Sequence, residues 1–312
     1  MSPRPGALPG ESRIGEADPG SGRDEPLPAD PGAARPPAPV RVPLPRDASA
    51  LPPLEPSFGR ALDRALASLD LDLTPGMRDA IEAHVRLLLA WSPFVNLTAI
   101  HGAEAIALEH VADSLAAVPP LLDRLAGRRR RPLGLLDLGS GAGYPGIPVA
   151  VAIPAGTAAL VDSVARKTAF LEAAAAGAGA ALRARDEEPV RMQVVNARGE
   201  ELARRPGQRE RWEVVTARAV AGLPWLLELA LPLVRPGGTF VAWKRDAGDG
   251  AFAAELDAAA PLLEELGADP RPEVLEVSVE GLSDHRLVLV TKRRATPGRW
   301  PRRPPHHRRL LR

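Results

Sequence analysis

The stretch LLDLGSGAGYPGIP, residues 135–148, decides the fold of this chain of 312 residues. It begins with a short apolar run of the kind that forms a strand buried on both faces of a parallel sheet. Four glycines follow the run, at positions 139, 141, 143 and 146. Glycine adopts positive φ without strain and lets a ligand come close to the backbone. The spacing therefore predicts a ligand-binding loop at the carboxyl end of a first strand.

Beyond the loop, segments with strand character alternate with segments of helix character. Apolar periodicity predicts helices over 166–176, 223–234 and 251–266, and apolar runs predict strands near 157–163, 192–197, 212–219, 239–244, 273–279 and 285–292. Such alternation produces right-handed crossovers and a mostly parallel sheet. The last two strands have no helix between them, which predicts an antiparallel pair at one edge. We therefore expect an α/β, Rossmann-like fold.

The part of the chain before the loop is predicted to be helical. One helix follows Pro56 and ends near Asp70, and a second begins at Pro75 with Thr74 as its N-cap. A third is expected over residues 104–118. The fold therefore carries an N-terminal helical segment, residues 57–127, ahead of the sheet.

The two ends of the chain differ from the middle in composition and charge. Residues 1–56 hold 15 of the 35 prolines and a net charge of −2, and residues 293–312 hold eight arginines and no acid. Neither end has a periodic apolar pattern that would offset its ordering entropy, so both are predicted to be disordered. One domain is expected over residues 57–292, and its net charge is −5.

Composition excludes several classes of protein. The chain has no cysteine, which excludes disulfides, thiolate metal sites and a cysteine nucleophile. The first residues have no apolar core of a signal peptide, and no run of about 18 apolar residues occurs. No cluster of side chains has metal-ligand spacing, and the His306–His307 pair is more consistent with contact to nucleic acid. We expect a cytoplasmic monomer with no metal and no membrane contact.

The glycine loop fits two classes of cofactor. Gly141, Gly143 and Gly146 satisfy the dinucleotide pattern GxGxxG. An acid, Asp137, precedes Gly139 by two residues, and the resulting DxGxGxG is the arrangement of S-adenosylmethionine enzymes, in which this carboxylate can face the ammonium group of the methionine part. Asp162, at the end of the second strand, is expected to accept hydrogen bonds from ribose hydroxyls in either class. The residues favour a methyltransferase and leave an NAD(P)-dependent oxidoreductase open.

At this point the chain resembles the 16S rRNA (guanine-N(7))-methyltransferase G family, also called the glucose-inhibited division protein B family. The GYPGIP extension and the NLTAI and HVADSL segments are more specific to that family than the glycine loop. The resemblance covers about residues 57–292. Its segments are Asn96–Ile100, Glu109–Leu115, Leu135–Pro148, Leu160–Leu171, Asn196–Leu202, Val214–Leu223 and Leu231–Lys244.

The resemblance implies a class I methyltransferase fold and transfer of a methyl group from S-adenosyl-L-methionine to nitrogen 7 of a guanine in 16S rRNA. The RNA partner is the rRNA itself or a small-subunit particle. Tyr144 replaces a Phe or Leu of the family, and Gly199 replaces an Ala. The implied cofactor contacts, together with the acid at the end of the second strand, are Gly139, Tyr144, Asp162, Gly199, Glu200 and Arg218.

The acceptor atom determines what catalysis requires. Nitrogen 7 of guanine has a free lone pair at neutral pH, so no general base is needed and no catalytic residue is assigned. Catalysis is expected from positioning and desolvation. A non-catalytic RNA-binding protein on the same fold is a further alternative, against which the intact glycine loop and Asp162 argue.

Other polar residues have competing interpretations. His110 is interpreted as a buried, satisfied histidine with Asp113 as a capping residue, and Lys244 either contacts an RNA phosphate or is solvated. The basic tail is expected to add nonspecific affinity for rRNA. Truncation after Lys292 is therefore expected to weaken RNA binding and to leave cofactor affinity unchanged.

Overall fold

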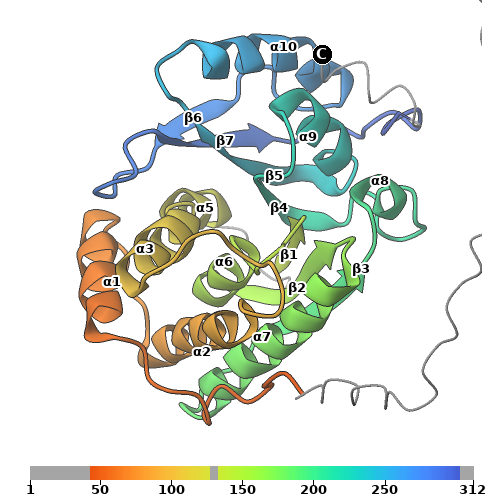
Figure 1. Cartoon of the computed structure of the whole chain (residues 1–312). Helices are drawn as coiled ribbons and strands as arrows, with labels where there is room; N and C mark the ends of the chain where they lie inside the picture. The colour runs from red at the N-terminus through yellow and green to blue at the C-terminus, as the bar shows by residue number, and fades with distance from the viewer. Residues whose placement is uncertain (1–42, 127–132, 303–312) are drawn as a thin grey trace, which may run out of the picture. The chain divides into compact units, whose positions relative to one another are not determined.

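A computed structural model of the chain describes residues 43–126 and 133–302. Within them, helices cover both faces of one mixed β-sheet (Figure 1). The strands are β1 (Leu133–Leu138), β2 (Ala155–Asp162), β3 (Arg191–Asn196), β4 (Trp212–Arg218), β5 (Val234–Arg245), β6 (Glu273–Glu276) and β7 (His285–Thr291). The helices are α1 (Pro56–Ser68), α2 (Pro75–Trp91), α3 (Ala103–Ala105), the π-helical η1 (Ile106–Ala112), α4 (Asp113–Leu115), α5 (Val118–Leu125), α6 (Gly146–Ala152), α7 (Ala165–Arg183), α8 (Gly199–Leu202), α9 (Leu223–Ala230) and α10 (Ala251–Glu265).

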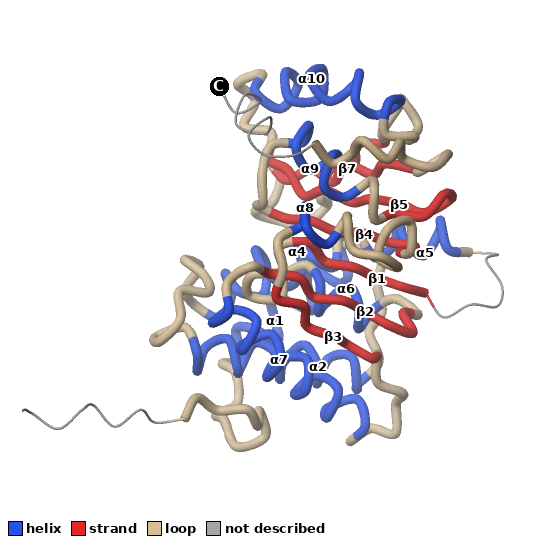
Figure 2. The backbone as a smooth tube through the Cα atoms, turned by 90° about the vertical axis from the view of Figure 1, so that its right-hand side faces the viewer, coloured by secondary structure: helices blue, strands red, loops and turns tan. Residues whose placement is uncertain are grey.

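The sheet has seven strands in the order β3-β2-β1-β4-β5-β7-β6, which Figure 2 shows from β7 down to β3. Strands β1 to β5 are parallel to one another, and β7 runs antiparallel to both β5 and β6. The expected Rossmann-like sheet with an antiparallel edge pair is confirmed. In this topology the carboxyl ends of β1 to β5 all lie at the same edge.

Alternate residues of the strands face two separate hydrophobic clusters. Leu135 of β1 belongs to the cluster that includes α1, α2, α6 and α7, whereas its neighbour Leu136 belongs to the cluster that includes α9 and α10. Val241 and Phe240 of β5 divide in the same way. Burial on both faces explains why these strands are continuous apolar runs.

The N-terminal helices begin where the sequence predicts. The hydroxyl oxygen of Thr74 accepts a hydrogen bond from the backbone N–H of Met77 (3.2 Å), which caps α2. The third expected helix exists but contains the π-helical segment η1 in its middle. Insertions of this kind are often associated with functional sites. The shorter helices α5, α6 and α8 were not expected from the sequence.

The structure differs from the sequence expectation at both borders of the domain. Residues 43–55 and 293–302 were expected to be disordered, but both pack on the domain. Trp91 donates a hydrogen bond from Nε1 to the carbonyl of Pro45 (2.7 Å), and Ala48 is buried. Trp300 is also buried. We therefore propose that the domain runs from about residue 43 to 302; residues 1–42 and 303–312 lie outside the described part of the chain.

One described stretch, Ala103–Leu125, is long and apolar enough to cross a membrane. Of its most apolar window, 67% is buried inside the protein. The hydropathy of this stretch is therefore explained by its place in the core, where Ile106 and Leu115 are fully buried.

Candidate functional site

The residues predicted to bind the cofactor all lie on segments that follow the carboxyl ends of neighbouring parallel strands. Gly139 and Tyr144 follow β1, Asp162 ends β2, Gly199 and Glu200 follow β3, and Arg218 ends β4. Ligands of open α/β sheets bind at this edge, where the strand order reverses on either side of the first strand. The topology thus brings the six residues to one edge.

The glycine loop is tied directly to Asp162. The backbone N–H of Gly141 donates to Oδ2 of Asp162 (3.0 Å), and the N–H of Val164 donates to Oδ1 (2.8 Å). Gly139 has a φ of +74°, and a Cβ there would lie 2.5 Å from Cγ2 of Val220. Each Asp162 oxygen has accepted one hydrogen bond and retains a lone pair. The carboxylate can therefore accept the hydroxyl pair of a ribose.

Asp137 does not occupy the position that the sequence suggested for it. Its side chain is completely buried, and a Cβ on Gly146 would lie 2.6 Å from its Oδ2. Its Oδ1 accepts a hydrogen bond from the hydroxyl of Thr216 (2.7 Å). Burial raises the pKa of Asp137 to about 6. The expectation that Asp137 faces a ligand is wrong in this structure: the carboxylate lies beneath the loop and links β1 to β4.

Tyr144 points inward from the loop and forms the middle of a three-ring stack. Its ring centroid lies 4.4 Å from that of His84 and 4.5 Å from that of His110, the latter with an interplanar angle of 5°. The Tyr144 hydroxyl is buried without a hydrogen-bond partner among the described residues. Its burial raises the pKa of Tyr144 well above the usual range. The side chain thus supports the loop from within, which leaves its backbone for contact with a ligand.

Both histidines of the stack are neutral at physiological pH. Burial lowers the pKa of His84 to about 4, and burial together with the nearby Arg218 guanidinium lowers that of His110 to about 3. His84 Nε2 lies 2.7 Å from the carbonyl oxygen of Ala142, and His110 Nε2 lies 2.6 Å from the Thr98 hydroxyl. The interpretation of His110 as a buried histidine with hydrogen-bond partners agrees with this geometry.

Arg218 is held in place by a network that the sequence did not reveal. It donates to Oδ2 of Asp113 (2.7 Å) and to the carbonyl of Glu109 (3.0 Å), and its Nη2 lies 3.1 Å from Nδ1 of His110. The other Asp113 oxygen lies 2.7 Å from Nδ1 of His285 on β7. Asp113 is therefore an ion-pair partner at the centre of three elements and not a helix cap.

Asp113 and His285 could not be found as a pair from the sequence, because they are 172 positions apart and only the fold brings them together. The signal available was indirect. Asp113 lies in the EHVADSL segment and His285 opens the last apolar run, HRLVLVT. Trp243 completes the group, since its Nε1 donates to the Asp113 carbonyl (2.8 Å).

Gly199 and Glu200 open the single turn of α8. A Cβ on Gly199 would lie 3.0 Å from Cδ1 of Leu138, the last residue of β1, so only a small side chain fits there. The carbonyl of Glu200 accepts a hydrogen bond from Nη1 of Arg204 (3.2 Å). The backbone of this turn consequently lies close to the start of the glycine loop.

A cavity of about 440 Å³ opens beyond Arg218, at the ends of β4 and β5. Glu109 and His110 of η1, Trp243 and Arg245 of β5, and His285 contribute to its walls. Its volume is in the range of small-molecule sites. Arg218 lines the cavity and also lies over the Tyr144 ring at 5.6 Å, so the cavity adjoins the glycine loop.

Lys244 lines the same cavity but is engaged inside the protein. Its Nζ pairs with Glu255 (2.7 Å) and donates to the carbonyl of Ala221 (2.9 Å), and its side chain is only 10% exposed. Neither a phosphate contact nor simple solvation describes it. Over residues 43–126 and 133–302 we find no group of three or more histidine and acidic side chains that could hold a metal ion.

Comparison with known proteins identifies the family of this chain. Residues 77–255 match the family model described as rRNA small subunit methyltransferase G. A protein of that name from Desulfitobacterium hafniense is 35% identical over 236 residues, which are 75% of this chain and 89% of the relative. Another from Rubrobacter xylanophilus is 38% identical over 220 residues, 70% of this chain and 77% of the relative. The chain belongs to the rRNA small subunit methyltransferase G family.

Proposed function

We propose that this chain transfers a methyl group from S-adenosyl-L-methionine to nitrogen 7 of a guanine in 16S rRNA. The observation that carries the proposal is the glycine loop bonded to Asp162 at the carboxyl edge of the sheet, next to an open cavity. The family of the chain agrees with this chemistry.

The residues present fit the methyl donor. Asp162 keeps a lone pair on each oxygen for the ribose hydroxyls, and the Gly141 backbone faces open space, since a Cβ there would meet only the Gly139 carbonyl at 3.8 Å. We propose that the backbone of Gly139, Tyr144, Gly199 and Glu200 contacts the ligand. When bound, S-adenosyl-L-methionine supplies an electrophilic methyl group. Arg218 would stand between the donor and the acceptor.

We propose that the acceptor base enters the cavity beyond Arg218. The donor site uses the ends of β1, β2 and β3, so the free side of the sheet edge is that of β4 and β5. Arg218 is paired with Asp113 at the cavity, so the exposed positive charge there is that of Arg245, whose side chain is 63% exposed. An RNA backbone that delivers a flipped or single-stranded guanine would meet this charge first.

The side chains around the site are suited to positioning and not to proton transfer. His84 and His110 are neutral and engaged, and Asp137 is sealed beneath the loop. Nitrogen 7 of guanine needs no deprotonation, because its lone pair is free at neutral pH. The contribution of the chain is to hold both partners in line and to exclude water.

The partner of the reaction is rRNA, either free or in a small-subunit particle. We propose that the chain acts in the cytoplasm, where ribosomes are assembled, and that it acts as a monomer. Both statements rest on the family and on the sequence expectations above.

Calorimetric titration with S-adenosyl-L-methionine and with NAD tests the cofactor. We expect binding of the first alone, and an Asp162→Asn variant is expected to bind about tenfold or more weakly, because it loses a charged hydrogen-bond acceptor. Ser163→Ala changes the adjacent, exposed residue and should bind as the parent does. Binding of NAD, or equal affinity in the Asp162 variant, would contradict the proposal.

A further inference from the structure

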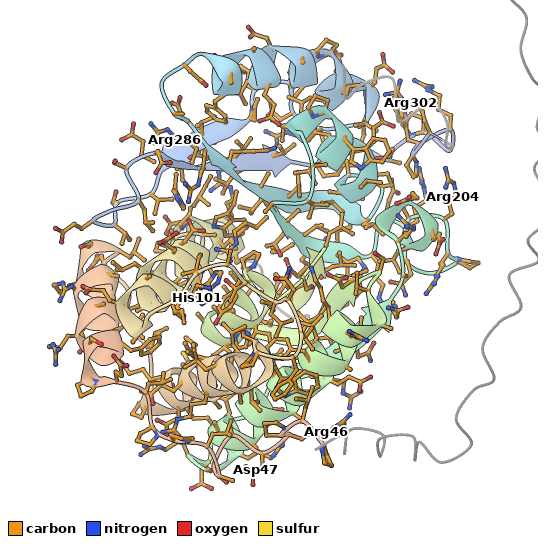
Figure 3. The ribbon with its side chains drawn as sticks, in the orientation of Figure 1. Arg46, Asp47, His101, Arg204, Arg286 and Arg302 are labelled. Carbon is orange, nitrogen blue, oxygen red and sulfur yellow. The ribbon has the colours of Figure 1, made fainter. Side chains whose placement is uncertain are left out.

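The last ten described residues, 293–302, form a segment that we call the C-terminal strap. It lies beside α8 and beside the ends of α9 and α10. Trp300 is only 5% exposed and belongs to the same hydrophobic cluster as Leu202 and Ala203 at the end of α8. Figure 3 shows Arg302 of the strap and Arg204, just beyond α8, on the same side of the molecule.

Two arginines that follow α8 hold the strap by its backbone. Arg209 donates to the carbonyls of Thr296 (2.6 Å), Pro297 (3.0 Å) and Trp300 (2.9 Å). Arg204 donates to the carbonyls of Pro301 (2.8 Å) and Arg302 (3.1 Å). These charge-assisted hydrogen bonds are stronger than neutral ones. The segment after α8 is therefore fastened to the strap along most of the strap's length.

The opposite side of the strap is fastened to the helical layer. The Thr296 hydroxyl donates to the carbonyl of Leu266 (2.7 Å), directly after α10. Arg302 pairs through Nε with both carboxylate oxygens of Glu228 on α9 (3.0 Å each), and the Glu228 side chain is fully buried. The strap thus connects the α8 segment to two helices that pack on the sheet.

The turn that the strap holds is the one that carries Gly199 and Glu200. Helix α8 has only four residues, and a helix of that length is not stable without tertiary contacts. Arg204 connects the two regions directly, because it bonds the strap through Nη2 and the Glu200 carbonyl through Nη1. The strap adds polar contacts to the apolar packing of Leu202 and Ala203, which holds the end of α8 in the same hydrophobic cluster.

We propose that the C-terminal strap is a positioning element for the donor site, with Arg204 as its link to the Gly199–Glu200 turn. This inference rests on the proposed function, in which that turn contacts S-adenosyl-L-methionine. It also changes the expectation for the tail. Truncation after Lys292 removes the strap, so it should weaken cofactor binding, whereas residues 303–312 can be removed without that effect.

Substitution of Arg204 tests the link, with Arg205 as a matched control. Both arginines are exposed, and the Arg205 side chain has no hydrogen bond or ion pair within the described part of the chain. Arg204→Ala is expected to raise the KM for S-adenosyl-L-methionine about fivefold, the effect of losing one ordinary hydrogen bond. The kcat at saturating cofactor should be retained, and Arg205→Ala should match the parent in both constants.

A pair of truncations separates the strap from the direct bond between Arg204 and Glu200. A chain that ends at Trp300 lacks both carbonyl acceptors of Arg204 but keeps Thr296 and Trp300. It is combined with Glu228→Gln so that no unpaired carboxylate remains buried. A chain that ends at Arg302 is its control. We expect weaker cofactor binding in the first truncation and parental binding in the second.

The outcomes distinguish this inference from the proposed function. If the parent chain does not bind S-adenosyl-L-methionine in the calorimeter, the proposed function fails. If the parent binds but Arg204→Ala and the Trp300 truncation bind equally well, only the strap inference fails. An equal loss in Arg205→Ala would attribute the effect to charge and would likewise overturn it.

Discussion

Gly139 shows how closely a single residue of the glycine loop is constrained. Its φ of +74° lies in the left-handed region, and a Cβ would come within 2.5 Å of Val220 on the loop after β4. Substitution by alanine therefore meets both backbone strain and a steric conflict. Because the steric conflict is with the side chain of Val220, a smaller residue at position 220 can relieve part of it.

We predict that Gly139→Ala abolishes or severely weakens binding of S-adenosyl-L-methionine. The double variant Gly139→Ala, Val220→Ala should recover part of the affinity, because the clash is removed while the strain of about 1–2 kcal/mol remains. Calorimetry on both variants measures this. Full affinity in the single variant would show that the loop does not need glycine at this position.

The ring stack of His84, Tyr144 and His110 gives the protein a pH dependence. The pKa of His84 in the folded chain is about 4 and that of His110 about 3, both below the usual value of 6.5. Between these lowered pKa values and pH 6.5, the two histidines bind more protons in the unfolded chain than in the folded chain. The free energy of unfolding therefore falls as the pH decreases below 6.5. Asp137, whose pKa is raised to about 6, acts in the opposite direction below pH 6.

We predict that His84→Gln reduces the loss of stability between pH 7 and pH 5, because it removes one buried histidine that takes up a proton on unfolding. One such histidine contributes at most about 1.4 kcal/mol per pH unit to this slope. Asp137→Asn should steepen that loss, since it removes the opposing contribution. Urea denaturation at a series of pH values measures both slopes. His101→Gln, at an exposed position, is the matched substitution with which both slopes are compared.

At the scale of elements, Asp113 joins the helical segment before the sheet to the sheet itself. It is 1% exposed and pairs with Arg218 of β4 and His285 of β7. Removal of one partner from a buried ion pair usually costs about 3–5 kcal/mol, because a charge is left without compensation. The same change would release Arg218 from its position between the proposed donor site and the cavity.

We predict that Asp113→Asn lowers both the free energy of unfolding and the rate of methyl transfer. Denaturation and a methylation assay at a temperature well below unfolding separate the two effects. Asp123→Asn, on the neighbouring helix α5, is a control in which no ion pair is lost among the described residues. A variant of Asp113 with parental activity would contradict the role assigned to Arg218.

The sequence predicted the elements far better than their connections. Apolar runs located the strands because burial on both faces favours consecutive apolar side chains, as at Leu135–Leu136 of β1 and Phe240–Trp243 of β5. The π-helical segment η1 was not foreseen, because its apolar spacing also fits an α-helix. Asp137 was assigned to the ligand from its spacing, yet its hydrogen bond to Thr216 depends on the pairing of β1 with β4. The strap was read as disordered, because the bonds that hold it come from Arg204 and Arg209, about 90 positions earlier.

At the scale of the whole molecule, charge is divided between an acidic domain and a basic C-terminal end. Within the strap the arginines are engaged: Arg293 pairs with Asp269, Arg299 with Glu265 and Arg302 with Glu228. We therefore expect the contribution of the basic end to RNA binding to come mainly from the four arginines beyond residue 302.

We predict that truncation after Arg302 weakens binding to 16S rRNA and reduces the slope of log K against log salt by up to about 3, as expected for four contacts to single-stranded RNA. Filter binding at several salt concentrations measures the slope. Cofactor affinity should not change. An unaltered slope would show that residues 303–312 do not contact RNA phosphates.

The most direct test of the proposed function is the chemistry of the rRNA itself. Reduction and aniline cleavage of 16S rRNA detect 7-methylguanine, and the test compares the parent strain with a strain that lacks this gene. We predict that one cleavage site disappears in the deletion strain, returns with the parental gene and does not return with the Asp162→Asn variant. Persistence of every 7-methylguanine in the deletion strain would contradict the assignment of the acceptor.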